Sequence, residues 1–542
     1  MKRRIVIYAL SFLCLALSAQ ENRVYLENSR TLSFDENRLP DAQILKGDVR
    51  FRHDDALMFC DSAYFFERTN SVTAFGHVRF EQGDTLHGFG DILYYEGDRK
   101  LARLCRNVRL EHKTTILTTD SLNYDRITNT AYYFTGGKIQ DSLNVLTSRW
   151  GEYCPSTNDA IFKYDVFLGN NSFTLNADRL KYNTATNTAQ LIAPTTIVYD
   201  GETTIYSSNG WYNTSTEQSM LLDRSVIEHV DGKFLTGDTI YYDKKQGFGQ
   251  LLYNIEMKDT VQKMTLTGHY AELLEKDRRG FVTDSAMLED WSQPKSTYMH
   301  ADTLFTEQFP CLDSTCRDTI WRQVRAYHHV RLYNEDYQIV TDSLTYNGRD
   351  SIIVLHHEPI LWSETNQVAA DSITMYLVNG TLDHIYGVGA AIGIQKETDE
   401  YFNQIVGKEM YAYIRNGALD RVDVIGNAET IFYPKDDSVT YVGVNKTRSS
   451  HVQTFMQEGK IHHVLFTTET SGTLYPLDQI DRKETFFPSF FWAESERPAS
   501  QSDIFLTPPS TLRPKTTSIS ATDEEDEVKT PKQKKQRNKK RK

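Results

Sequence analysis

Three pairs of adjacent histidines are the residues of this chain that most resemble metal ligands. They are His328-His329, His356-His357 and His462-His463. Adjacent side chains on an extended strand point to opposite faces, so one pair cannot readily chelate one ion. We therefore predict exposed or tyrosine-packed histidines, with no metal and no cofactor.

A recurring aspartate is the second candidate for chemistry. It opens the phrase D-x-(L/I)-x-Y, and a ladder of such carboxylates could serve acid catalysis or bind calcium. Successive copies lie a full repeat apart, however, whereas calcium loops place several carboxylates in one short segment. Two copies carry Arg149 and Ser208 in its place. We predict that the aspartate bonds backbone groups at a strand start, as aspartate does in turns.

No established catalytic motif is present. The sequence has no G-x-S-x-G, no Walker loop, no dinucleotide fingerprint and no H-E-x-x-H. We predict that the chain is not an enzyme. A polysaccharide-processing β-helix enzyme is kept as an alternative, but it would need clustered carboxylates or basic residues on one surface strip, and we find none.

Cysteine usage gives one candidate disulfide. Cys311 and Cys316 lie in the segment FPCLDSTCRD, where a local bond could close the loop in an oxidising compartment. A metal there is disfavoured, because no second Cys or His pair stands nearby at ligand spacing. Small buried side chains are expected of Cys60, Cys105 and Cys154.

The element that carries these residues is a repeat of 29 or 30 residues, with strong copies beginning at Asp61, Asp91, Asp120, Arg149, Asp178, Ser208 and Asp238. Weaker copies begin near His269, at Asp302, Asp342 and Asp371, and near Lys408. In one copy Asp120, Leu122 and Tyr124 lie two apart and should share one side of an extended chain. A polar turn and an alternating segment such as Val72–Phe80 follow. One repeat is thus two short strands and two turns, a period typical of solenoids and stacked arrays.

The predicted fold class is all-β, an elongated repeat of antiparallel strands in which each unit buries its apolar side against its neighbours. Helices are disfavoured because no long segment keeps a 3.6-residue apolar period. The copies are imperfect: Gly151 and Gly210 stand at the third position of two of them, and Phe65 replaces the first tyrosine.

We divide the chain into five parts. Residues 1–19 have the cationic start, apolar run and small residues of a secretory signal peptide, and no later run approaches the ~20 apolar residues of a membrane span. Repeats are expected over 20–300 and continue over 301–484, with an insertion near 306–325. Residues 485–492 form an aromatic cap, with a docking segment as the alternative. Residues 493–542 form a disordered tail with a basic end.

The formal net charge is −13, which would repel a phosphorylated glycolipid. Nucleic acid is not expected as a partner. The basic end, Lys529–Lys542, could bind anionic head groups, or it could be a solvated terminus.

The repeated apolar face has two interpretations. It could be a packed core, or it could line an apolar groove between two splayed sheets, suited to hydrocarbon chains. A shift of one residue in register would exchange the lining residues. The candidate lining residues are Leu93, Tyr95, Leu122, Tyr124, Leu180, Tyr182, Ile240, Tyr242, Leu344 and Tyr346.

Two copies carry a resemblance to a known family: Asn176–Asn183 (NADRLKYN) and Thr236–Asp243 (TGDTIYYD). With the signal peptide and the period, they resemble the OstA-like or LptA family, the periplasmic β-jelly-roll proteins of lipopolysaccharide transport. The resemblance covers roughly residues 40–430. Thr119, in place of the small residue before Asp120, is a departure.

The resemblance implies a two-sheet, V-shaped jelly-roll whose apolar interior shields the acyl chains of lipopolysaccharide. It implies a periplasmic bridge, associated with the outer membrane, that docks with like-folded proteins of the inner- and outer-membrane complexes or head to tail with its own copies. The chain is longer than a minimal member, so we expect two jelly-roll segments on either side of Phe309–Arg325. The alternative is a structural or adhesive secreted β-solenoid with a packed interior and no lipid ligand.

Overall fold

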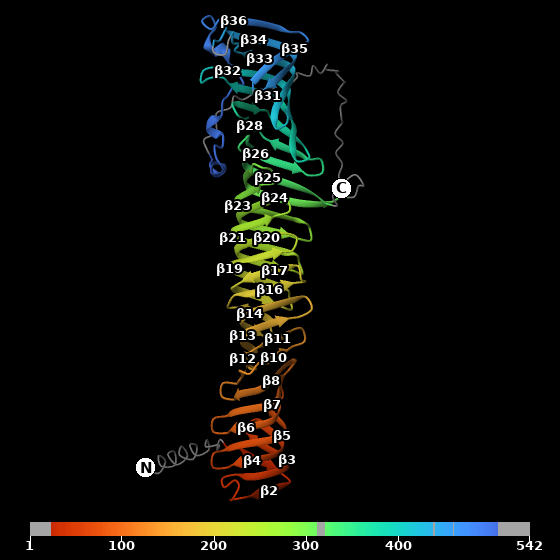
Figure 1. The fold of residues 1–542 in the computed structure, drawn as a ribbon, viewed down its shortest axis with the longest axis vertical. Coiled ribbons are helices and arrows are strands. Elements are labelled where there is room, and N and C mark those ends of the chain that lie inside the picture. Colours follow the sequence, from red (N-terminus) through yellow and green to blue (C-terminus); the bar gives the residue numbers. More distant parts are fainter. Residues whose placement is uncertain (1–22, 312–319, 437–439, 459, 508–542) are drawn as a thin grey trace, which may run out of the picture. The chain divides into compact units, whose positions relative to one another are not determined.

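The computed structural model describes residues 23–311, 320–436, 440–458 and 460–507 (Figure 1). Most of these residues lie in antiparallel β-strands, which confirms the predicted all-β class. Within these ranges the helices are three short 3-10 turns, η1 (Arg482–Thr485), η2 (Glu494–Glu496) and η3 (Gln501–Phe505). No helix in this part of the chain is long and apolar enough to cross a membrane. The predicted signal peptide and basic tail lie outside the described residues.

The chain divides into two compact units. The first runs to Glu364 and also takes in Thr374–Asp383 and Pro498–Thr507, whereas the second holds Thr365–Ile373 and His384–Arg497. The sequence placed a division near residue 300. Near residue 300 the strands pair without interruption, because much of the insertion lengthens two strands. The division between the two units lies between Glu364 and His384.

The first unit begins with β1 (Tyr25–Asn28), β2 (Thr31–Phe34), β3 (Gln43–His53), β4 (Ala56–Phe66), β5 (Ser71–Gln82), β6 (Leu86–Glu96), β7 (Leu101–His112) and β8 (Thr115–Asp125). It continues with β9 (Thr130–Tyr133), β10 (Gly137–Gln140), β11 (Val145–Ser148), β12 (Trp150–Cys154), β13 (Asp159–Gly169), β14 (Phe173–Asn183), β15 (Thr188–Leu191), β16 (Thr195–Tyr199), β17 (Thr203–Ser207), β18 (Asn209–Asn213) and β19 (Gln218–His229). It ends with β20 (Lys233–Asp243), β21 (Phe248–Asp259), β22 (Met264–Leu274), β23 (Arg279–Asp290), β24 (Thr297–Pro310), β25 (Ile320–Tyr333), β26 (Gln338–Asn347), β27 (Ile352–His356) and β28 (Ile360–Ser363).

The second unit holds β29 (Asn366–Ala369), β32 (Phe402–Arg415), β33 (Ala418–Phe432), β34 (Val444–Gln457), β35 (Lys460–Thr467) and β36 (Ser471–Tyr475). Two strands, β30 (Ser372–Val378) and β31 (Thr381–Lys396), contribute residues to both units.

Long strands of the first unit bend at their middle. In β5, for example, Gly76 and His77 both have positive φ, and β5 carries one more residue there than the neighbouring β4 and β6. Such a β-bulge sharply bends its strand. The same bend recurs at Arg106-Asn107 and Asp223-Arg224. Each long strand is therefore divided into two halves, which we call arms, one on either side of a common corner. The strands form one continuous sheet, which this repeated corner folds into two facing arms, in agreement with the β-jelly-roll that the sequence predicted.

In the second unit a C-terminal segment, residues 485–493, packs against β29, β32 and β33. The Gln404 side chain donates to the Thr485 carbonyl (2.9 Å) and accepts from the Phe487 amide (3.0 Å). Gln367 binds the segment in the same way, at the Phe491 carbonyl and the Ala493 amide. The sequence predicted a cap over the end of the last repeat, whereas the described contacts are with a sheet face.

Candidate functional site

The inner surface of the first unit is built of three rows of side chains, each row running from strand to strand. The tyrosine row joins directly paired residues of neighbouring strands, in which the tyrosine of D-x-L-x-Y alternates with a small residue. We call the buried stretch of this row its closed part; it consists of Tyr95, Ala102, Tyr124, Ala131, Tyr153, Ala160, Tyr182, Ala189 and Tyr212. All nine are buried. Large rings beside small side chains interdigitate without voids.

The second row, the floor row, lies next to the corner. From β19 onward its members are Leu221, Ile240, Leu251, Ala271, Val282, Leu304, Ala326, Leu344 and Leu355. None is more than 4% exposed. The two arms therefore remain closed along the corner.

All ten side chains predicted to line a groove lie on this inner surface. Eight are buried, while Tyr242 and Tyr346 are partly exposed. Their contact with a lipid stays a prediction.

The third row, the rim row, lies on the other arm. Its members are Phe51, Met58, Phe80, Gly88, Leu110, Leu117, Ile139, Leu146, Leu168, Leu175, Ile197, Ile205, Ile227, Leu235, Met257, Leu266, Leu288 and Met299. From Phe51 to Ile197 this row is buried, and Met299 is buried again.

Six consecutive members between these parts are partly exposed, and we call them the inner window: Ile205, Ile227, Leu235, Met257, Leu266 and Leu288. Phe80 and Met257 occupy equivalent positions on β5 and β21, yet only Phe80 is buried. Because the floor row stays buried beside the window, we infer that the arms part at the rim.

Contacts across the interior show the same change. In the closed part the tyrosine row touches the opposite arm: Tyr95 bonds to His53 (2.6 Å) and Tyr153 bonds to His112 (2.7 Å). On β20, which carries the window residue Leu235, Tyr242 instead donates to Glu275 (2.6 Å), in the turn after β22. The sequence repeat predicted the tyrosine row but not the inner window. The window residues belong to the alternating segments, and no local sequence pattern distinguishes these six residues from the buried members of the rim row.

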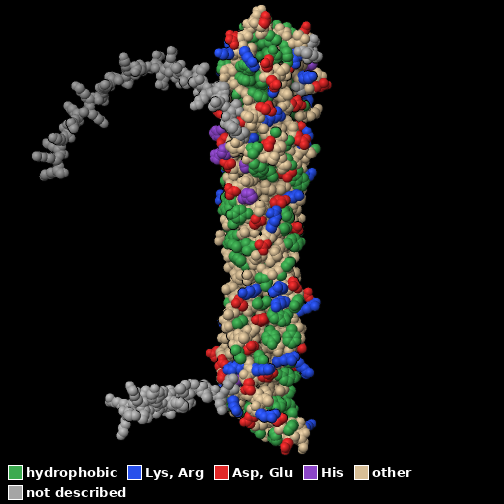
Figure 2. Space-filling model, turned by 90° about the vertical axis from the view of Figure 1, so that its left-hand side faces the viewer, with side chains coloured by type: hydrophobic (Ala, Val, Ile, Leu, Met, Phe, Trp, Pro, Cys, Tyr) green, Lys and Arg blue, Asp and Glu red, His purple; other side chains and the backbone are tan. Residues whose placement is uncertain are grey.

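The repeated aspartates lie at the corner. Asp61, Asp91 and Asp238 are each near the middle of an 11-residue strand, not at a strand start as predicted. They are exposed or partly exposed, although the apolar residue two positions later (Ala63, Leu93 or Ile240) is buried, because the neighbouring bulge turns the corner at this point. Asn107 donates to Asp91 and Asn254 to Asp238, so these carboxylates bond side chains across the bend. On the face shown in Figure 2, acidic and basic side chains are interspersed with apolar ones.

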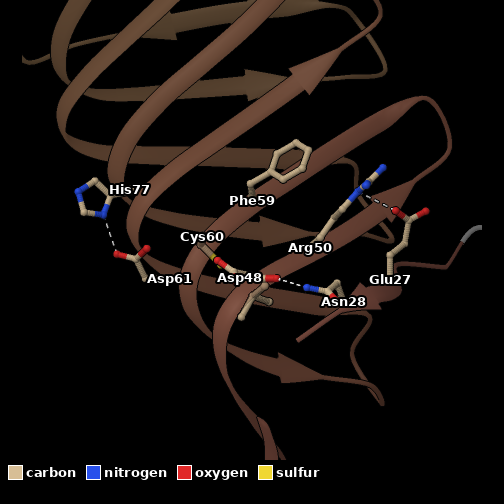
Figure 3. Close-up of a pocket in the computed structure, with 9 residues that line it drawn as sticks. Glu27, Asn28, Asp48, Arg50, Phe59, Cys60, Asp61 and His77 are labelled. Atoms are coloured by element: carbon tan, nitrogen blue, oxygen red, sulfur yellow. Dashed lines mark hydrogen bonds and ion pairs between the residues drawn. The ribbon is translucent and has the colours of Figure 1, made fainter. Parts of the chain in front are cut away.

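A shallow polar depression lies at this corner near the start of the first unit (Figure 3). Asp61 accepts a hydrogen bond from His77 (2.7 Å), which raises the pKa of that histidine. Glu27 pairs with Arg50 (2.9 Å). Each of these charged groups has its partner within the depression. No three His, Cys, Asp or Glu residues are grouped to hold a metal in the described ranges.

His328 and His329 occupy a corner bulge. Both have positive φ, so they do not point to opposite faces of a regular strand as expected. Both are exposed, as predicted, and each bonds a different aspartate: His328 to Asp342 (3.2 Å) and His329 to Asp302 (2.9 Å).

The cysteines separate into bonded and free groups. Cys311 is disulfide-bonded, and its predicted partner Cys316 lies outside the described residues. Cys60, Cys105 and Cys154 are free thiols. Cys60 is buried, which raises its pKa to about 11. Cys105 and Cys154 are only partly buried.

A model of the OstA-like protein family matches residues 21–178 and 166–231. This part of the chain resembles the OstA-like family. A solved structure also matches, that of LptH, the LptA homologous periplasmic component of the conserved lipopolysaccharide transport device from Pseudomonas aeruginosa. Identity is 12%, the TM-score is 0.21, and the match covers 26% of this chain and 95% of that chain. No curated protein matches.

The OstA-like match ends at residue 231, just before β20. It includes Ile205 and Ile227 of the inner window, whereas the other four window residues lie beyond it. The closed part of the rim row therefore lies almost wholly within the OstA-like match, and most of the open part lies outside it.

Proposed function

We propose that this chain is a non-catalytic carrier of an amphipathic lipid of the lipopolysaccharide type, acting in the periplasm in association with the outer membrane. The observation that carries the proposal is the inner window, an apolar row that is partly exposed over six strands while the floor row beside it stays buried. The resemblance to the OstA-like or LptA family of lipopolysaccharide transport agrees with this choice of lipid.

The window has the dimensions and chemistry for an acyl chain. Neighbouring strands lie ~4.8 Å apart, so the five steps from Ile205 to Leu288 span about 24 Å. That length accommodates an extended acyl chain. Each methylene group transferred from water contributes about 0.8 kcal/mol, and the six apolar side chains lose their own contact with water at the same time.

The free edge of the first strands supports a like-folded partner. In the described part of the chain, β1 and β2 each pair with β3 alone. Leu32 and Phe34 of β2 are 56% and 59% exposed. An unpaired edge is a template for strand addition. We propose that a like-folded jelly-roll, a second copy of this chain included, docks there.

Photocrosslinking tests the carrier function. A photoreactive residue replaces Met257 of the window, Glu256 beside it on the opposite face of β21, or Phe80 at the equivalent closed position. Crosslinking in a Gram-negative envelope should give lipopolysaccharide adducts at Met257 and none at Glu256. Adducts at Phe80 should be few.

The alternative is a structural or adhesive β-solenoid with a packed interior. The buried rows over β3–β16 favour this alternative for the N-terminal part of the first unit. Folded protein that forms no lipid adduct at Met257 or Leu266 would support this alternative and contradict the carrier.

A further inference from the structure

An arginine lies on the inner surface beside the window. On β25, Arg322, Val324 and Ala326 lie two apart and therefore point to the same face. Ala326 is buried between its cross-strand neighbours Leu304 and Leu344 of the floor row. Arg322 thus faces the interior, farther along the arm that carries the tyrosine row.

The guanidinium of Arg322 reaches across to the opposite arm. Its Nη1 lies 3.9 Å from the sulfur of Met264 on β22. Met264 precedes the window residue Leu266 by two positions, so both side chains lie on the same face of that strand. The positive charge of Arg322 therefore lies at the rim of the inner window.

Within the described residues this guanidinium makes no direct ion pair, although the Asp259 carboxylate acts on it electrostatically. Among the described residues no carboxylate oxygen lies within 4.0 Å of it. Other arginines differ: Arg126, inside the closed part, binds Asp55 (2.6 Å) and the Tyr95 hydroxyl (2.7 Å). Arg325, three residues along β25, binds Glu307 (2.9 Å). Arg322 keeps its charge when partly buried, so its donors remain available.

Two carboxylates face the same space. Asp259 and Asp290 are the cross-strand neighbours of Met264. Asp259 accepts from the amides of Val261 and Gln262, and Asp290 accepts from the amide of Ser292. Oδ1 of each carboxylate is therefore engaged in its own turn. The charge of Asp259 acts on Arg322, and both charges oppose the approach of another anion.

We propose that Arg322 binds the anionic group, phosphate or carboxylate, of an amphiphile whose apolar part lies on the inner window. The inference rests on the proposed carrier function and deepens it. A guanidinium presents two parallel N–H groups to such an anion, which a thioether contact cannot satisfy. The window alone would bind any apolar chain, whereas Arg322 selects one with a negative head.

The test uses two fluorescent probes of similar size, the anionic 8-anilinonaphthalene-1-sulfonate and the uncharged N-phenyl-1-naphthylamine, on the full chain. Arg322→Met should weaken binding of the anionic probe about tenfold, the effect of one charge-assisted hydrogen bond, and leave the neutral probe unchanged. Arg325→Met, which removes a partnered arginine from the same strand, should change neither. Asp259→Asn keeps the turn acceptor and should tighten the anionic probe.

Displacement of the anionic probe by dodecyl phosphate and by dodecanoate then shows whether the site prefers a phosphate or a carboxylate. Equal effects of Arg322→Met on both probes, or no effect on either, would overturn the role of Arg322 while leaving the carrier intact. Failure of the wild-type chain to bind either probe would overturn the carrier as well. If Arg322→Met does not fold, Asp259→Asn decides: an unchanged affinity for the anionic probe contradicts the proposal.

Discussion

Single residues explain why some copies of the repeat depart from its consensus. Gly151 stands where D-x-L-x-Y calls for leucine, and a Cβ on Gly151 would lie 2.5 Å from the Tyr133 ring. Tyr133 is fully buried and bonds to Ser148 (2.7 Å), so its ring fills the space that the leucine would need.

Restoring the consensus at this position should therefore be harmful. We expect Gly151→Leu to destabilise β12 and β13 by about 2–3 kcal/mol through overpacking. Tyr133→Ala in the same chain should recover part of this loss, because it vacates the space. Amide hydrogen exchange in the two strands measures the local free energy. Strictly additive effects of the two substitutions would contradict the idea that the leucine and the Tyr133 ring compete for the same space.

The buried histidine His112 makes stability depend on pH. Burial lowers its pKa below 6.5, with Lys113 acting in the same direction, so the folded state keeps it neutral. Between the folded pKa of His112 and 6.5 the unfolded chain binds more protons than the folded chain. The free energy of unfolding therefore falls as the pH falls through this range. His77 has a raised pKa beside Asp61, so its contribution has the opposite sign and is lost as pH rises.

Replacing His112 separates these two effects. We expect His112→Gln to flatten the loss of stability between pH 7 and 5, measured as the urea midpoint at each pH. His77→Gln serves as control and should leave that acid slope at least as steep. An unchanged slope in His112→Gln would show that other groups govern the acid response.

At the scale of elements, two glutamines hold the C-terminal segment of the second unit. Gln367, Ile394, Gln404 and Ile431 are cross-strand neighbours, and all four are buried. Each glutamine gives the segment one donor and one acceptor, as a neighbouring strand would. Phe402 on the same strand as Gln404 contacts the rings of Phe486, Phe490 and Trp492.

Loss of one glutamine should loosen the segment. We expect Gln404→Ala to leave the Phe487 amide and the Thr485 carbonyl unpaired, at about 1–3 kcal/mol. Faster hydrogen exchange at the Phe487 amide measures the change. Gln453→Ala removes a glutamine that bonds Asp423 elsewhere in the unit and should leave that amide unaffected. Equal exchange in both variants would argue against a holding role.

At the scale of the whole molecule, the free edge of β2 should decide assembly. We expect Leu32→Lys with Phe34→Lys to weaken concentration-dependent self-association, because lysine on an edge strand opposes strand addition. Sedimentation velocity across a concentration series measures this. Tyr94→Lys is the control, since Tyr94 is 46% exposed on a strand that is paired on both sides. Unaltered association of the double variant would contradict docking at this edge.

The net charge of −13 also acts at this scale. It opposes a phosphorylated lipid at long range, whereas binding at Arg322 is local. At 0.15 M salt charges beyond about 8 Å are largely screened. The overall charge therefore does not by itself exclude an anionic ligand.

The sequence by itself determined the strand repeat and the inward direction of its Leu and Tyr residues. Side chains alternate along a strand, so a phrase as short as D-x-L-x-Y is enough to define a buried face. The position of the aspartate at a bend, by contrast, depends on a bulge in the neighbouring strand, which the phrase does not contain.

Only the tertiary structure decided where the interior opens. The exposure of Met257 or Leu266 depends on the separation of two arms, and that separation is set by residues far apart in the chain. Arg322 and Met264, 58 positions apart, meet across it. No local pattern specifies such a distance, and so the inner window and its arginine emerge from the packing of the arms.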